Sequence, residues 1–545
     1  MINLIPAKRL TTLALAGAAW SFLASPAHAI FFDGNGHYSL LGQTRTSPGF
    51  DSGSGLHQAV DQNFLLNWEL RANDSLSMWL RLELFQDPSE AYLGDTAEPQ
   101  DCSERDEGLS QANNEPVYKN RGSIRNCAGR HQATGEPRYR NYQPQISQAF
   151  VRYAFDYCLL DVGRRPRSWG LGIFLDGGGR LFDTDASVFD GATCHINIQK
   201  SQTLALSFGL DKLAETGVSV IPGTQEGGPF GAAKPSDDID QYFFTIEYDD
   251  RRVNAGSALT QQVGIYFANI ISSGDEQRDI RRSDIKFADL YLSFFLRNLV
   301  IKNELLFRLG RSSDPSWARL GGQMNKEGEP TSNRLQSIAS AGSLDFIVSK
   351  SGNVIGPPEY NQGDLTQHVV FFDYAHAPGD RDGYIGYGDD DAPLNRNGAV
   401  SAVAFHKNYK PALILFNGRQ ENANLRVDGI FDPERVLNAT LFGLGYRYES
   451  QVNGTFESKF IFAQLDQVMP EAVKESLNLA SELPVGFAGK TIGYELDLKY
   501  HKLFGKNVDV GAAAGVLIPG AGLKHFADRS APTSYVLQSF AAFKF

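Results

Sequence analysis

Three neighbouring arginines are the side chains in this sequence whose chemistry is easiest to state. They occur in the string GRRPRSWGLG of residues 163–172, and a fourth arginine follows three consecutive glycines. Guanidinium groups bind carboxylates and phosphates through paired hydrogen bonds. The pattern therefore suggests a narrow passage for anionic solutes, with four candidate constriction residues: Arg164, Arg165, Arg167 and Arg180.

The same string also indicates where a strand ends. Pro166 has no N–H to give to a strand ladder, and the charges beside it cannot continue into lipid. We expect the segment to leave the wall to which that strand belongs and to fold inwards. An exposed loop held by its glycines is the alternative.

Recognisable catalytic motifs are absent from the sequence. There is no G-x-S-x-G, H-E-x-x-H or G-x-x-x-x-G-K-[ST] string, and none of the ten histidines pairs with a serine in a recognisable elbow. Asp183, Asp185 and Asp190 resemble a calcium loop but lack its terminal Glu and its full ligand spacing. We predict no enzyme activity, no cofactor and no metal site, and a membrane-embedded hydrolase is the least favoured alternative.

Four cysteines fall into two pairs along the chain. Cys102 and Cys127 lie in one polar segment, whereas Cys158 and Cys194 flank the next segment. The sequence has no C-x-x-C string, which argues against a zinc site, and disulfides are allowed in an oxidising periplasm. All four are disulfide candidates; the sequence does not fix their connectivity, and four free thiols are the alternative.

The first residues are typical of an export signal. Lys8 and Arg9 precede a mostly apolar run at residues 10–23, and Ala27-His28-Ala29 is a small-x-small cleavage site. We predict a cleaved signal peptide over residues 1–29. No later stretch reaches about 18 apolar residues, so any embedding in a membrane has to use strands.

The charge balance argues against nucleic acid as a partner. The whole chain carries a formal charge of −12, and removing Lys8 and Arg9 with the signal makes the remainder more acidic. No linker-like change of composition and no repeat of 20–50 residues interrupts the chain. We therefore predict one large domain over residues 30–545, with a long polar insertion at residues 87–144.

Strict alternation of apolar and polar residues identifies the strands. In the string TIGYELDLKYH of residues 491–501, apolar and aromatic residues take one face and polar residues take the other. Residues 64–71 and 75–84 repeat the pattern on both sides of Asn73-Asp74, as in a tight hairpin. Strands of this length suit a tilted crossing of a membrane, in which one face meets lipid and the other meets water.

Short turns alternate with long polar loops along the chain, which is typical of outer-membrane barrels. We predict an all-β, transmembrane antiparallel β-barrel of about 18 strands, with 16 as the second choice, short periplasmic turns and long extracellular loops. Residues 333–350 are interpreted as a short helix followed by a strand, residues 400–405 and 412–416 as strands, and residues 471–479 as a helical turn. An interior of this width holds a water-filled channel.

Charged residues on the polar strand faces are predicted to line the channel. They form a solvated wall of paired charges in the simplest interpretation, and they set ion selectivity in the functional one. The lumen-facing candidates are Glu69, Arg71, Arg81, Glu83, Lys302, Glu304, Glu495, Asp497 and Lys499.

The end of the chain also carries a signal. Residues 535–545 alternate once more and finish on Phe545. Such an end resembles that of bacterial outer-membrane barrels, whose assembly machinery recognises it. We therefore predict Phe545 as an assembly signal and the barrel assembly machinery as a partner.

Taken together, these features resemble the alginate-export family of outer-membrane proteins. The resemblance rests on GKTIGYELDLKYHKLF at residues 489–504, on VLIPG at residues 516–520 and, more weakly, on GRRP at residues 163–166. It implies a monomeric barrel of about this strand count and a passage lined by Arg or Lys for an anionic polysaccharide. The acidic charge and the insertion at residues 87–144 depart from such an exporter.

We predict a passive pore in the outer membrane of a Gram-negative cell, with lipid and lipopolysaccharide around it. Hydrophilic solutes, which could include anionic ones, would pass through its hydrated lumen. The alternatives are a dedicated exporter of an acidic, alginate-like polysaccharide and a plugged barrel whose loops serve adhesion or receptor binding.

Overall fold

The structure is a computed structural model, and it describes a defined part of the chain. No helix among the described residues is long and apolar enough to cross a membrane. The described residues are 31–46, 56–84, 145–178, 183, 186–198, 203–213, 239–251, 259–272, 283–312, 333–351, 366–379, 399–417, 435–468, 489–505, 507–524 and 532–545.

Several predictions concern segments outside the described residues. These are the signal peptide (residues 1–29), the insertion (residues 87–144), the helical turn (residues 471–479), and the side chains of Cys102, Cys127 and Arg180.

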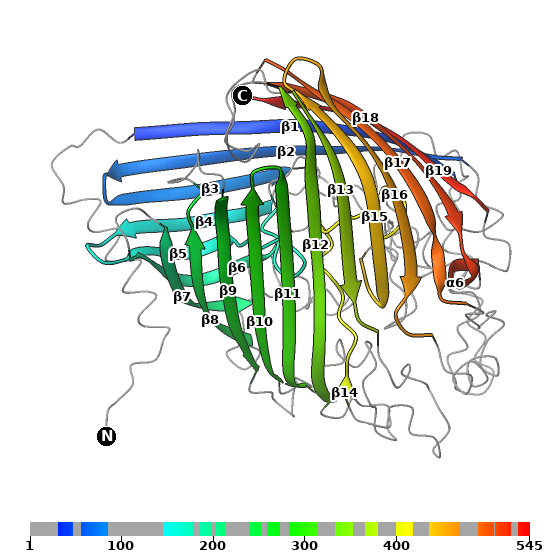
Figure 1. Cartoon of the computed structure of the whole chain (residues 1–545). Helices are drawn as coiled ribbons and strands as arrows, with labels where there is room; N and C mark the ends of the chain where they lie inside the picture. The colour runs from blue at the N-terminus through cyan, green and yellow to red at the C-terminus, as the bar shows by residue number, and fades with distance from the viewer. Residues whose placement is uncertain are drawn as a thin grey trace, which may run out of the picture.

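Within the described residues, eighteen antiparallel strands form one closed barrel, which confirms the predicted fold class (Figure 1). Each strand pairs with its neighbours in sequence, and the last strand pairs with the first. The two-residue strand β14 is additional and runs parallel to β12. A single helical turn, α6 (Ala521–Lys524), follows β18. The strands are β1 (Phe31–Thr46), β2 (Leu56–Asn73), β3 (Leu76–Leu84), β4 (Gln145–Ala154), β5 (Leu159–Pro166), β6 (Val188–Asn197), β7 (Leu204–Leu213), β8 (Ile239–Asp249), β9 (Leu259–Ser272), β10 (Ser283–Leu296), β11 (Leu299–Ser312), β12 (Asn333–Ser351), β13 (Thr366–Ala377), β14 (Ala399–Val400), β15 (Ala439–Ser450), β16 (Gly454–Leu465), β17 (Thr491–Phe504), β18 (Val508–Pro519) and β19 (Ser534–Lys544).

The connections differ between the two ends of the barrel. At one end most turns are short, as between β2 and β3, between β10 and β11, and between β15 and β16. At the other end lie the long connections, which include those from β3 to β4, from β5 to β6 and from β13 to β15. Short and long connections alternate because successive strands run in opposite directions.

The wall of the barrel has polar side chains on its inner face and large apolar side chains on its outer face, the reverse of a water-soluble protein. In β17 the carboxylate residue Glu495 is 0% exposed, whereas the next residue, Leu496, is 47% exposed. Large apolar side chains are exposed on the same outward face around the barrel, and such a surface is stable only against an apolar medium. Examples are Leu210, Phe267, Leu309, Phe346, Leu444, Phe460, Tyr494 and Leu537.

The hydrophobic core lies inside the barrel. Its main cluster combines buried wall residues such as Leu306 and Leu441 with residues from two connections, among them Ile173, Phe405 and Ile414. A smaller cluster contains Phe295, Ile347, Val369 and Phe371. Residues of the connections after β5 and after β13 therefore lie inside the barrel and supply much of the core.

The helix predicted within residues 333–350 and most of the strands predicted at residues 400–405 and 412–416 are wrong, and one strand is missed. Residues 333–351 form one strand without a helix, and its inward positions carry Ser337, Ala339 and Ala341, small side chains that pack in the core and obscure the alternation. Most of residues 400–405 and 412–416 is not in strands; only β14 pairs with the wall. Strand β1 was not predicted, because glycines and polar residues break its pattern.

The barrel closes where β19 meets β1. The N–H of Gly36 donates to the carbonyl of Phe545 at 2.9 Å, and the N–H of Phe545 donates to the carbonyl of Gly36 at 3.0 Å. The ring of Phe545 stacks on Phe64 of β2 with centroids 5.9 Å apart. The final residue therefore contributes to the seam, and its role as an assembly signal stays a prediction.

Substituting Phe545 separates these two roles. Phe545→Ala and Phe64→Ala remove the same ring contact, worth about 0.5–1.5 kcal/mol beyond area burial. Phe64→Ala also removes a contact with Tyr38, so it should lose at least as much stability as Phe545→Ala after refolding in detergent. In cells, we expect less folded Phe545→Ala barrel than folded Phe64→Ala barrel, measured by heat-modifiable migration on gels. Equal amounts in cells would contradict the assembly-signal prediction.

Candidate functional site: two segments folded into the barrel

The first inner segment, residues 167–178, follows β5 and packs against the inner wall. The ring of Trp169 lies 5.6 Å from that of Tyr266 on β9, centroid to centroid. Phe174 stacks on Phe287 of β10 at 4.5 Å. Gly264 of β9 leaves room for this packing, because a Cβ atom there would lie 2.8 Å from Cη2 of Trp169.

A buried carboxylate holds the first inner segment. The backbone N–H of Leu171 donates to Oε2 of Glu304 on β11, which is fully buried. The approach requires glycine at position 170, where φ is +57° and a Cβ atom would lie 2.5 Å from Oε2 of Glu304. Gly170 thus permits the close contact between the backbone of this segment and Glu304.

The second inner segment, residues 399–417, belongs to the long connection between β13 and β15. Its first part is held by the buried Arg308 of β11. One nitrogen of this guanidinium, Nη2, donates to the carbonyls of Val400 at 3.2 Å and Ala402 at 2.8 Å. In Figure 1 the yellow strand β14 lies at the end of β12, with which it pairs.

The other part of the second inner segment is held by acids on β17. The carboxylate of Glu495 accepts hydrogen bonds from the N–H groups of Ile414 at 2.6 Å and Leu415 at 2.8 Å. Asp497 accepts one from the N–H of Leu413 at 3.0 Å. These bonds give partners to three consecutive buried N–H groups, each of which costs free energy when it is left without one.

Two further cations bind carbonyls of the second inner segment. Lys459 of β16 donates to the carbonyl of Pro411 at 3.0 Å, and Arg45 of β1 donates to that of Ile414 at 3.3 Å. Since β11, β16, β17 and β1 all contribute, the segment is held from widely separated parts of the wall. The two inner segments also touch, because the N–H of His406 donates to the carbonyl of Ile173 at 2.8 Å.

Two of the predicted constriction arginines help to hold the first inner segment. Arg165 and Arg167 both pair with the buried Asp211 of β7, at 3.3 Å and 2.7 Å. The guanidinium of Arg167 also lies 3.7 Å from the ring centroid of Phe243. Both side chains therefore have carboxylate or aromatic partners within the protein.

The prediction for Arg164 is wrong. This residue alternates with the inward-facing Arg165, and it shares its face with Val162, which is exposed on the outer surface. Its guanidinium pairs with Asp190 of β6 at 2.7 Å. The sequence pattern treated the three arginines alike, although the alternation of β5 separates Arg164 from Arg165.

The pairing register puts the nine candidate wall residues on the inward face, in two different environments. Glu69 and Arg71 form a partly exposed ion pair at 2.8 Å near the end with the short turns. Glu304, Glu495 and Asp497 are buried against the inner segments, and Glu83 is buried against Ser147. Arg81 donates to Asn67, Lys499 lies 3.9 Å from Glu457, and Lys302 lies opposite Ser343. A solvated wall is thus wrong for the four buried acids.

The structure joins Cys158 and Cys194 in a disulfide, with Cα atoms 5.6 Å apart. The bond connects the residue before β5 to β6, so it crosslinks the strands on both sides of the first inner segment. Among the described residues, no group of three or more His, Cys, Asp and Glu residues is arranged to hold a metal ion.

Sequence reasoning missed a His–Ser contact on the inner wall. Nδ1 of His195 lies 2.8 Å from the hydroxyl of Ser207, and its Nε2 lies 3.4 Å from Asp161. Arg152 binds both oxygens of the same carboxylate, at 2.7 Å and 2.9 Å. These residues form a polar network on β4–β7 in which Ser207 is buried. No local motif could indicate it, because each residue lies on a different strand.

Sequence reasoning also missed the cations that hold the second inner segment. Arg45, Arg308 and Lys459 lie at inward positions of strands far apart in sequence. Only Arg308 had an available signal, namely neighbours two positions away on the same strand that are apolar or small, whereas Arg45 and Lys459 follow Gln43 and Glu457 at that spacing. In β11, Leu306 and Gly310 lie two positions before and after Arg308.

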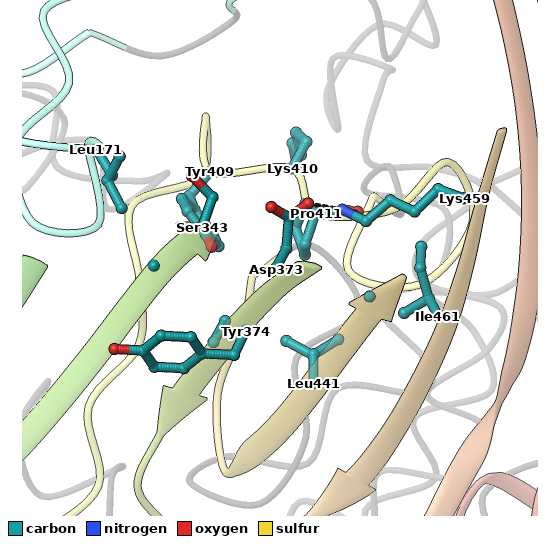
Figure 2. Close-up of a pocket in the computed structure, with 13 residues that line it drawn as sticks. Leu171, Ser343, Asp373, Tyr374, Tyr409, Lys410, Pro411, Leu441, Lys459 and Ile461 are labelled. Carbon is teal, nitrogen blue, oxygen red and sulfur yellow. Dashed lines mark hydrogen bonds and ion pairs between the residues drawn. The ribbon is translucent and has the colours of Figure 1, made fainter. Parts of the chain in front are cut away.

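A cavity of about 230 Å³ lies where the second inner segment meets the wall. Figure 2 shows Lys459 reaching towards Asp373 and Pro411, while the ring of Tyr374 points away from them. Burial raises the pKa of the Tyr409 phenol, so this hydroxyl stays neutral. The cavity is lined by Leu171, Gly342, Ser343, Asp373, Tyr374, Ala375, Tyr409, Lys410, Pro411, Leu441, Gly443, Lys459 and Ile461.

Comparison with known proteins finds similar structures at low sequence identity. No protein-family model and no curated protein matches the chain. Among solved structures, Pseudomonas aeruginosa OccK9 (OpdG) has 14% identity and a TM-score of 0.45, with 94% of this chain and 98% of that chain covered. Acinetobacter baumannii OccAB4 has 10% identity and a TM-score of 0.43, with the same coverage. We therefore base the function on the barrel itself, and the alginate-export resemblance stays a prediction.

Removing the Glu495 carboxylate tests how the second inner segment is held. Glu495→Ala deletes the acceptor of two N–H groups, and leaving a buried donor without a partner costs about 1–3 kcal/mol. We expect hydrogen exchange at Ile414 and Leu415 to accelerate on the order of tenfold or more, measured by mass spectrometry. Asp284→Asn, at a largely exposed acid, is the matched control and should change nothing there. Unchanged protection in Glu495→Ala would show that the carboxylate does not hold the segment.

Proposed function

We propose that the protein is a passive channel for hydrophilic solutes in the outer membrane of a Gram-negative bacterium. One observation carries the proposal: a closed barrel exposes many large apolar side chains on its outer surface and buries charged side chains such as Glu304, Arg308 and Glu495 on the inner one. A membrane accepts that outer surface, and a polar interior suits water and dissolved solutes.

The two inner segments support selection by size and charge. Each is held in place by buried, charged wall residues, so the width of the path depends on fixed backbone positions. We propose that these segments form the constriction of the channel. Arg165 and Arg167 contribute to it by holding the first inner segment.

The chemistry of the solute is a finer part of the proposal. An anionic polysaccharide requires guanidinium groups that face the path, but Arg165 and Arg167 pair with Asp211, which offsets their charge. These ion pairs therefore favour a channel for hydrophilic solutes in general over a dedicated exporter of an alginate-type polysaccharide. A barrel plugged for adhesion or receptor binding stays an alternative, because many of its long loops lie outside the described residues.

The proposed location implies a set of partners. Residues 1–29 would direct export, the barrel assembly machinery would insert the chain, and lipid and lipopolysaccharide would surround a monomer. In this orientation the short turns face the periplasm and the long connections face the outside, as is usual for such barrels.

Single-channel conductance in a planar bilayer tests the proposal. We expect stable openings, and a reversal potential under a salt gradient that shifts towards cation selectivity in Arg165→Ala/Arg167→Ala, because Asp211 then loses its partners. Arg164→Ala is the matched control, since Arg164 lies on the outer face, and its reversal potential should equal that of the unsubstituted protein. Absence of any conductance from the folded barrel would overturn the channel.

A further inference from the structure

The cavity beside the second inner segment combines opposite charges with an apolar lining. Asp373 of β13 and Lys459 of β16 form an ion pair at 2.7 Å, and Lys459 also donates to the carbonyl of Pro411. Leu441 and Ile461 add apolar surface from β15 and β16. Because the two charges offset each other, this pair favours neither an anion nor a cation. Lys410, the third charged residue of the lining, also interacts with another group of the protein.

Asp373 is the more accessible member of the pair. Its side chain is 29% exposed, compared with 10% for Lys459. The lysine therefore orients the carboxylate, while the carboxylate retains surface at which a solute can donate hydrogen bonds. Ser343 lines the same cavity and adds a hydroxyl group, which both donates and accepts.

The size of the cavity limits the solute. A cavity of about 150 Å³ binds benzene, which has six non-hydrogen atoms, so by the same ratio 230 Å³ accommodates roughly nine, about the ring of a hexose and half of its substituents. Gly443 helps to create this room, because a Cβ atom there would lie 2.5 Å from Cε of Lys459. The lysine side chain passes over the glycine to reach Asp373.

We propose that this cavity is a subsite for an uncharged, polyhydroxylated solute of the size of a monosaccharide. Its hydroxyl groups donate to Asp373 and exchange hydrogen bonds with Ser343, and its apolar face packs on Leu441 and Ile461. The inference rests on the proposed channel function and deepens it, because it places a binding step beside the constriction.

Three probes with the same ring separate charge from shape: glucose, glucuronate and glucosamine. The measurement is the interruption of the single-channel current as each sugar is added to a salt solution. We expect glucose to interrupt the current at the lowest concentration. Asp373→Asn should raise that concentration about tenfold, whereas the control Asp284→Asn should leave it unchanged.

A second variant covers the case in which Asp373→Asn does not fold. Ser343→Leu fills the cavity without changing any charge, and it should abolish the interruptions while the conductance in salt alone persists. Stronger interruption by glucuronate or glucosamine, or equal interruption by all three sugars, would overturn the subsite. If a variant conducts no current in salt alone, that result bears on the proposed channel and not on the subsite. Binding of glucose to the folded barrel, measured by calorimetry, then tests the subsite separately.

Discussion

Buried backbone groups need hydrogen-bond partners, and this requirement shapes the interior of the barrel. The two inner segments carry N–H and C=O groups that no strand ladder satisfies. Wall acids accept from the N–H groups, as Glu304 does for Leu171 and Glu495 does for Ile414. Wall cations donate to the carbonyls, as Arg308 does for Ala402. Charged side chains thus take over the role that a neighbouring strand has in a sheet.

This arrangement divides the charges of the inner wall into two groups. Those that bind the inner segments are buried and hold the backbone, whereas those nearer the short turns, such as Glu69 and Arg71, retain contact with solvent. Selectivity in a channel depends mainly on charges of the second kind, because a buried charge with partners within the protein interacts less with a passing ion. Counting the charges of the wall therefore says little about selectivity.

Period-two alternation was sufficient to predict the antiparallel barrel, its strand count and the inward position of residues such as Glu495. It could not predict what lies across the interior from each residue. Glu495 and Lys499 share a face in the sequence, yet only Glu495 binds the second inner segment. The same limit explains the error over residues 412–416, whose apolar side chains pack in the core without pairing as a strand. Such contacts join positions far apart in the chain, and local patterns do not report them.

The position of the second inner segment in the chain has a consequence for the order of assembly. The segment precedes β15, but Glu495 and Asp497 follow it in β17, and Arg45 becomes its neighbour only when the ends of the chain meet. Its contact with Arg45 therefore requires that β1 and the rest of the wall surround the segment. A barrel that has not closed lacks this part of its interior.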